Sequence, residues 1–153
     1  MIHYEVMSEQ EAMAERFQIL KEGEYEAMIT ASQDTQSINS GNPMMDMTVT
    51  VYDEKGKSHD IRDFLVFTKP MMWKVVHFAN SAGILKEYED GKLCSKLAIE
   101  KHVKVKVIIE EGREIPNDKL NGKPAGSKYN DKNKIEDYII KEISIKDDYD
   151  LDL

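Results

Sequence analysis

One property of this chain limits its fold more than any other: a residue period of two, interrupted once by a helical period. Apolar and polar residues alternate in five segments, as they do in strands with one buried face. Between the third and fourth segments, residues 68–83 follow helical spacing. The segments with the period of two are residues 24–31, 44–52, 59–67, 101–111 and 135–145. The sequence therefore predicts three strands, a helix and two further strands.

This order of elements is typical of the OB fold, in which a helix between strands three and four closes one end of a small barrel. We therefore expect a mainly β protein, an OB-like five-stranded antiparallel Greek-key barrel over residues 23–145. At 153 residues, the chain is long enough for one domain with a real core. Ser8 and Glu11 fit a capping box, which predicts an N-terminal helix within residues 1–22 that packs on the domain. Residues 146–153 would follow the barrel as an acidic tail.

The inserted helix has its own signals. Thr68 can cap it, and Pro70 suits its first turn. Trp73, Val75 and Phe78 make it apolar nearly all round, which predicts burial on more than one side.

Charge is distributed unevenly along the chain, and this matters more than the net charge of −8. Residues 92–134 carry eleven basic and six acidic groups, net +5, while the segments before and after are acidic. Eighteen of the 21 cations are lysines. A lysine is a point charge rather than a bidentate fork, so it suits attraction to phosphates better than the reading of bases.

Two polar stretches, residues 32–43 and 112–134, are rich in turn residues and predict loops. The second contains several lysines, and such a loop beside a basic strand is what single-strand binding requires: cations for phosphates and exposed aromatic rings for bases. The stacking candidates are Tyr52, Phe64 and Tyr129, and the cation candidates are Lys101, Lys104, Lys106, Lys119, Lys123, Lys128, Lys132 and Lys134. Each has a plain alternative, because outward lysines also protect strand edges and Tyr52 can simply cover a seam.

No catalytic constellation is present in the sequence. The four histidines, His3, His59, His77 and His102, are scattered without metal-ligand spacing. Asp60 and Asp63 lie three apart on a predicted strand, so their side chains should point to opposite faces. Cys94, the single cysteine, has no partner and is expected in the core. We expect neither enzymatic activity nor a cofactor or metal, and a small hydrolase or nuclease is the disfavoured alternative.

The chain ends in "KDDYDLDL", in which aspartates alternate with Tyr149 and two leucines. Acidic residues followed by an apolar tip resemble the tails with which single-strand-binding proteins of bacteria and phages recruit replication and recombination enzymes. We expect this tail to bind such partners, although it can equally serve only for solubility. Its residues are Asp147, Asp148, Tyr149, Asp150, Leu151, Asp152 and Leu153.

Several motifs also resemble a family of small proteins encoded by phages and prophages, mostly described as of unknown function and regarded as single-strand-binding-like. They are "GEYEAMI" (23–29), "SGNPMMDM" (40–47), "IRDFLVF" (61–67), "MWKVVHFANSAGI" (72–84) and "YNDKNKIEDY" (129–138). The resemblance implies a role with single-stranded DNA and no catalytic residues.

We therefore expect sequence-nonspecific binding of single-stranded DNA in phage or mobile-element replication or recombination. The alternative is an acidic protein-interaction module or DNA mimic that docks on a host or phage enzyme. No apolar run approaches the roughly 20 residues needed to span a bilayer, and no signal peptide precedes the domain, so we expect a cytoplasmic protein. Homo-oligomers are compatible with the predicted edge strands.

Overall fold

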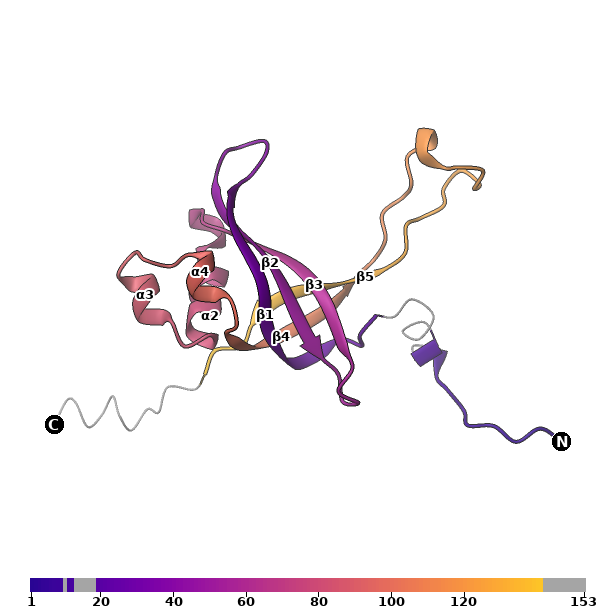
Figure 1. Ribbon diagram of the computed structural model, residues 1–153. Helices are drawn as coiled ribbons and strands as arrows, with labels where there is room; N and C mark the ends of the chain where they lie inside the picture. Colours follow the sequence, from indigo (N-terminus) through magenta and orange to yellow (C-terminus); the bar gives the residue numbers. More distant parts are fainter. Residues whose placement is uncertain (10, 13–18, 142–153) are drawn as a thin grey trace.

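A computed structural model describes residues 1–9, 11–12 and 19–141 (Figure 1). Five strands form one sheet in the order β3-β2-β1-β4-β5, and every neighbouring pair is antiparallel. The strands are β1 (Gly23–Gln36), β2 (Pro43–Tyr52), β3 (Ser58–Val66), β4 (His102–Glu110) and β5 (Lys132–Tyr138). The predicted mainly β class, the five antiparallel strands and the helix between strands three and four are confirmed.

Alternating residues of these strands build the core, as the period of two predicts. On β2, Met45, Met47, Val49 and Val51 are all buried. Val103, Val105 and Val107 of β4 are also buried, while the residues between them face solvent. The inner face of the sheet was therefore readable from the sequence.

The sheet is not closed into a barrel, and this part of the prediction is wrong. β3 and β5 are its two edges and no strand ladder joins them. They meet instead through side chains: the Tyr138 hydroxyl donates to Asp63 Oδ2 at 2.6 Å, and Lys74 Nζ donates to Asp63 Oδ1 at 3.0 Å. Alternation within single strands does not reveal whether the first and last strands of a sheet pair with each other.

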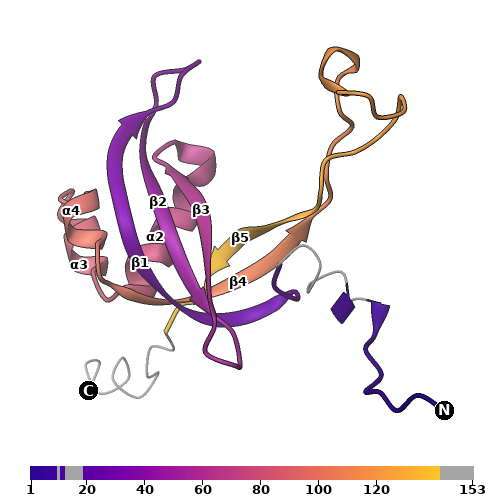
Figure 2. The ribbon, with the colours of Figure 1, turned by 45° about the vertical axis from the view of Figure 1, so that its right-hand side comes forward.

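One main helix and several short turns connect β3 to β4 on one side of the sheet (Figure 2). These are η1 (Lys69–Met71), α2 (Met72–Ser81), α3 (Leu85–Glu89) and α4 (Ser95–Ala98). α2 buries Val75 and Phe78, but Trp73 is 46% exposed and Lys74 is buried. Burial therefore extends around much of α2, as predicted, but Trp73 is not part of it and the charged Lys74 is. Thr68 makes no side-chain cap bond to η1.

β1 is longer than its pattern suggests. The predicted loop 32–43 begins as strand, because residues 32–36 pair with residues 43–47 of β2. A register shift between Ile29 and Ala31 separates this extension from the rest of the strand. Residues 44–47 of its partner also pair with β3, so only the loop that joins this extension to β2 projects from the sheet (Figure 1). A polar strand of this kind has no buried face, so alternation could not identify it.

At the amino terminus, one bond of the predicted capping box is present: the Glu11 N–H donates to Ser8 Oγ at 3.0 Å. The predicted helix beyond Ala12 lies largely outside the described residues. Leu20 is buried, and the side-chain amide of Asn133 binds both the N–H and the C=O of its backbone. At the other end, β5 begins at Lys132, three residues before the predicted strand 135–145, and ends at Tyr138. Residues 142–145 of that predicted strand lie outside the described residues. None of the described helices is long and apolar enough to cross a membrane.

Candidate nucleic-acid interface

The loop between β4 and β5, residues 111–131, is tied together at its base. The Tyr129 N–H donates to the Arg113 carbonyl at 2.9 Å, and the Ile115 N–H donates to the Ser127 carbonyl at 2.8 Å. The apolar side chain of Ile115 is buried and anchors the first half of the loop. The loop therefore leaves the sheet as two bonded segments (Figure 1).

Gly112 allows these two segments to lie very close to each other. A Cβ atom at this position would lie 1.7 Å from the carbonyl oxygen of Tyr129. The Gly112 N–H donates to Asp131 Oδ1 at 2.9 Å. Any larger residue would push the two segments apart, so glycine fixes the position of Tyr129 relative to Arg113.

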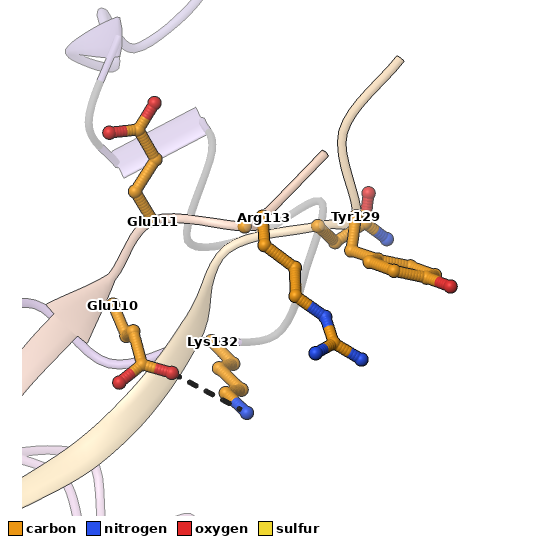
Figure 3. Close-up of a pocket in the computed structure, with 7 residues that line it drawn as sticks. Glu110, Glu111, Arg113, Tyr129 and Lys132 are labelled. Atoms are coloured by element: carbon orange, nitrogen blue, oxygen red, sulfur yellow. Dashed lines mark ion pairs between the residues drawn. The ribbon is translucent and has the colours of Figure 1, made fainter. Parts of the chain in front are cut away.

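A cavity of about 600 Å³ lies at the base of this loop (Figure 3). Arg113 and Tyr129 project from its two neighbouring segments, and the guanidinium carbon lies 5.7 Å from the centre of the tyrosine ring. Tyr129 is 39% exposed. The lining residues are Glu110, Glu111, Gly112, Arg113, Tyr129, Asn130 and Lys132. We call this cavity the loop-base pocket.

Carboxylates accompany five of the eight predicted lysines, a feature that the sequence did not reveal. The closest of these pairs are Lys128–Glu111 at 2.7 Å and Lys106–Glu136 at 3.0 Å, and in both the hydrogen bond with glutamate raises the pKa of the lysine. The other three are Lys104–Glu24, Lys132–Glu110 and Lys134–Glu110, with distances of 3.7, 3.5 and 3.6 Å. Their positive charge is therefore partly compensated.

Lys101, Lys119 and Lys123 form no ion pair with another residue in the described part of the chain. Lys119 and Lys123 lie in the β4–β5 loop and are exposed. Lys101 precedes β4 at the end away from this loop. Nine strand residues lie between, at roughly 3.3 Å each, so Lys101 and the loop cations do not meet in one groove.

On the outer face of β3, Phe64 is 40% exposed and lies beneath Arg62, whose guanidinium carbon is 4.8 Å from the ring centre. Asp46 on β2 binds Arg62 through both carboxylate oxygens. These bonds hold the pKa of the Asp46 carboxyl below its usual range. The charge of Arg62 is therefore already compensated.

Tyr52 has a very different surrounding from the other two stacking candidates. It lies in a second cavity, of about 520 Å³, at the start of β1. Burial and the nearby charges of Glu54 and Asp53 raise the pKa of Tyr25 in this cavity. Five carboxylates and a single lysine line it: Glu22, Glu24, Glu26, Asp53, Glu54 and Lys21. We call it the acidic cavity; a phosphate would be repelled there.

The predicted separation of Asp60 and Asp63 is confirmed. Asp60 is exposed and accepts a hydrogen bond from Thr50 Oγ1 at 2.8 Å, while Asp63 is buried on the other face. Among the described residues, no group of three or more His, Cys, Asp or Glu side chains is arranged to hold a metal ion. The tail residues, Asp147 to Leu153, lie outside the described residues.

Two features of this surface escaped the sequence analysis. Arg113 was not selected, because its proximity to Tyr129 depends on the pairing of two segments sixteen residues apart. In the sequence, Arg113 is distinguished only by being one of three arginines among the 21 basic residues. The ion pairs of the strand lysines also escaped, because each depends on a partner in a neighbouring strand.

Comparison with known proteins bears on the family of this chain. Residues 7–130 match the family described as "Protein of unknown function (DUF669)". The chain belongs to this family. The match includes β1 to β4 and most of the β4–β5 loop, with Arg113 and Tyr129. No curated protein matches the sequence. The family description contains no activity, so single-strand binding stays a prediction.

Proposed function

We propose that this protein binds single-stranded DNA with little sequence preference, in phage or mobile-element replication or recombination. One observation supports this above others: the β4–β5 loop carries the half-exposed Tyr129 close to Arg113, and it contains three cations without an ion pair among the described residues. These cations are Arg113, Lys119 and Lys123. Single-strand binding needs this combination of stacking surface and positive charge.

The topology supports an OB-like interpretation of the open sheet. OB folds are partly open five-stranded structures that bind oligonucleotides on strands two and three and on the loops after strands one and four. Here the β1–β2 loop and the β4–β5 loop leave the sheet at opposite ends of β1, but the sheet is bent and both loops project in a similar direction (Figures 1 and 2). Phe64 lies on the outer face of β3, the edge strand next to β2. A strand of DNA would cross this face toward the loop-base pocket.

The paired lysines can join this interface by exchanging partners. Exposed lysine–glutamate pairs contribute little to stability, so a phosphate can replace the glutamate at small cost. Lys128, Lys132 and Lys134 lie near the loop and are the candidates for such exchange. We leave Tyr52 outside the interface because of the carboxylates that surround it.

Titration of fluorescently labelled oligo-dT at 50 and 200 mM salt tests the proposal. We expect affinity at 50 mM that falls steeply at 200 mM, because bound cations release counterions from the phosphates. Absence of binding at 50 mM, or an affinity independent of salt, would reject the proposal.

The acidic tail would recruit replication or recombination proteins in this scheme, and it rests on sequence alone. Partners captured from a host lysate by the intact protein should be lost with a variant that ends at Ile145, while DNA binding is retained. Equal capture by both proteins would remove this role from the tail.

A second candidate function, docking on a basic partner protein, is favoured by the acidic cavity. Its five carboxylates offer charge complementarity to lysines and arginines of another protein. Partners captured equally without the tail, together with no DNA binding, would favour this function over the first.

A further inference from the structure

We infer that Arg113 and Tyr129 form a subsite for one unpaired nucleotide, with the base on the exposed part of the tyrosine ring and the adjoining phosphate on the guanidinium. The inference rests on the proposed function and names the place where a strand is held most firmly. Neither side chain alone suffices: a ring offers stacking to any base, and an arginine fork binds phosphate through two parallel hydrogen bonds.

The two side chains are held in position before any ligand binds. The Tyr129 N–H donates to the Arg113 carbonyl at 2.9 Å, so the residues are direct partners across the ribbon. Gly112 lets the two segments approach, and the buried Ile115, two residues after Arg113, anchors them. A site built on paired backbone loses less conformational entropy on binding than one on a free loop.

The guanidinium of Arg113 is the charged group of this pocket that stays unpaired among the described residues. Glu110 is paired with Lys132 and Lys134, and Glu111 is paired with Lys128. Asp131, next to the pocket, accepts the Gly112 N–H, and Glu114 lies opposite Lys128 across the loop. The four cations and four carboxylates of this region therefore balance. Arg113 itself forms no ion pair with another described residue, so its guanidinium is open to a phosphate.

The size of the cavity also suits one nucleotide. Its volume of about 600 Å³ falls within the range of roughly 300–1,000 Å³ for small-molecule sites. A base can reach the ring only when it is unstacked, which favours single strands over duplexes. Because every base has a flat face, the subsite should accept all four.

The chain contains a matched comparison for each half of the subsite. Arg62 also lies over an aromatic ring, Phe64, but Asp46 binds its guanidinium through two bonds. Tyr52 is 38% exposed, against 39% for Tyr129, but carboxylates surround it. Only the pair at the loop base combines an open ring with an open guanidinium among these residues.

The test measures the dissociation constant of labelled oligo-dT for four single variants over a series of salt concentrations between 50 and 200 mM. We expect Tyr129→Ala to raise the dissociation constant roughly fivefold or more, because a stacked base is lost, and Tyr129→Phe to restore the affinity. Arg113→Ala should lower the slope of log affinity against log salt by about 0.7, the value for one phosphate of a single strand. Tyr52→Ala should change the affinity less than twofold.

Each failure has a separate meaning. If the unmodified protein binds oligo-dT but Tyr129→Ala and Tyr52→Ala are equivalent, the subsite is wrong and the proposed function stands. An unchanged salt slope in Arg113→Ala overturns the assignment of the phosphate. If the unmodified protein does not bind at 50 mM salt, the proposed function and the subsite fall together. Weak binding by Tyr129→Phe would show that the hydroxyl, rather than the ring, acts there.

Discussion

Lys74 Nζ lies 3.0 Å from Asp63 Oδ1, and both side chains are buried between the open edges of the sheet. Lys74 comes from α2 and Asp63 from β3. The same ammonium donates to the Ile135 carbonyl of β5 at 2.8 Å, and the Tyr138 hydroxyl of β5 donates to Asp63 Oδ2 at 2.6 Å. This network joins β3 and β5 where the backbone does not.

Replacement of Lys74 by methionine should strongly destabilise the fold. The substitution keeps the apolar stem but leaves the Asp63 carboxylate buried without its cation, which typically costs about 3–5 kcal/mol. Urea unfolding followed by circular dichroism measures the change. An effect below about 1 kcal/mol would mean that the carboxylate finds water or a proton without difficulty.

Lys106→Met is the matched control for this experiment. Lys106 lies at the same distance, 3.0 Å, from Glu136, but both side chains are nearly half exposed. Water solvates the separated charges there, so we expect the free energy of unfolding to remain almost unchanged. A loss equal to that of Lys74→Met would show that burial is not the cause.

Tyr138 should make the protein sensitive to alkaline pH. Burial, followed by the charge of Asp63 and its hydrogen bond, raises the pKa of this hydroxyl well above 10.0. The folded state therefore holds the proton more tightly than the unfolded state. This stability is present below about pH 10 and declines as the pH rises above the pKa of the unfolded tyrosine. The urea midpoint should fall less between pH 8 and pH 11 in Tyr138→Phe than in the unmodified protein.

At pH 8 the same substitution should itself destabilise the protein by about 1–3 kcal/mol, because one oxygen of Asp63 loses its donor. Identical pH dependence of the two proteins would assign the alkaline loss to other groups.

Gly112→Ala should loosen the base of the β4–β5 loop. The new Cβ atom would meet the Tyr129 carbonyl oxygen at 1.7 Å, so the backbone must move. We expect faster hydrogen exchange at the Ile115 and Tyr129 amides. Gly23→Ala is the control, because its Cβ would find only an ordinary contact of 3.8 Å with the Tyr25 ring, and neither glycine has a left-handed φ. Unchanged exchange in Gly112→Ala would contradict the close approach.

Asn133→Ala should release the backbone at Leu20. The Asn133 side chain accepts the Leu20 N–H at 2.6 Å and donates to the Leu20 carbonyl at 2.9 Å. Hydrogen exchange at the Leu20 amide should accelerate. Asn133→Asp keeps the acceptor but loses the donor, so it should give an intermediate rate. Equal rates in all three proteins would show that burial of the leucine side chain is enough.

Sequence periodicity predicted the parts of this fold that depend on local properties. Met45, Met47, Val49 and Val51 mark one face of a strand because alternate residues always point the same way. The capping bond of Ser8 involves residues three apart and was equally predictable. Tyr52 and Phe64 were chosen as stacking candidates from outward strand positions, and they are 38% and 40% exposed.

The sequence by itself determined the five strands, their buried face and the helix between the third and fourth. Only the tertiary structure decided that the sheet stays open, that Lys74 is buried and that glutamates accompany the strand and loop lysines. The physical reason is the distance along the chain over which each interaction acts. Backbone geometry imposes its period on neighbouring residues, whereas an ion pair such as Lys106–Glu136 or a contact such as Arg113–Tyr129 depends on which segments lie side by side.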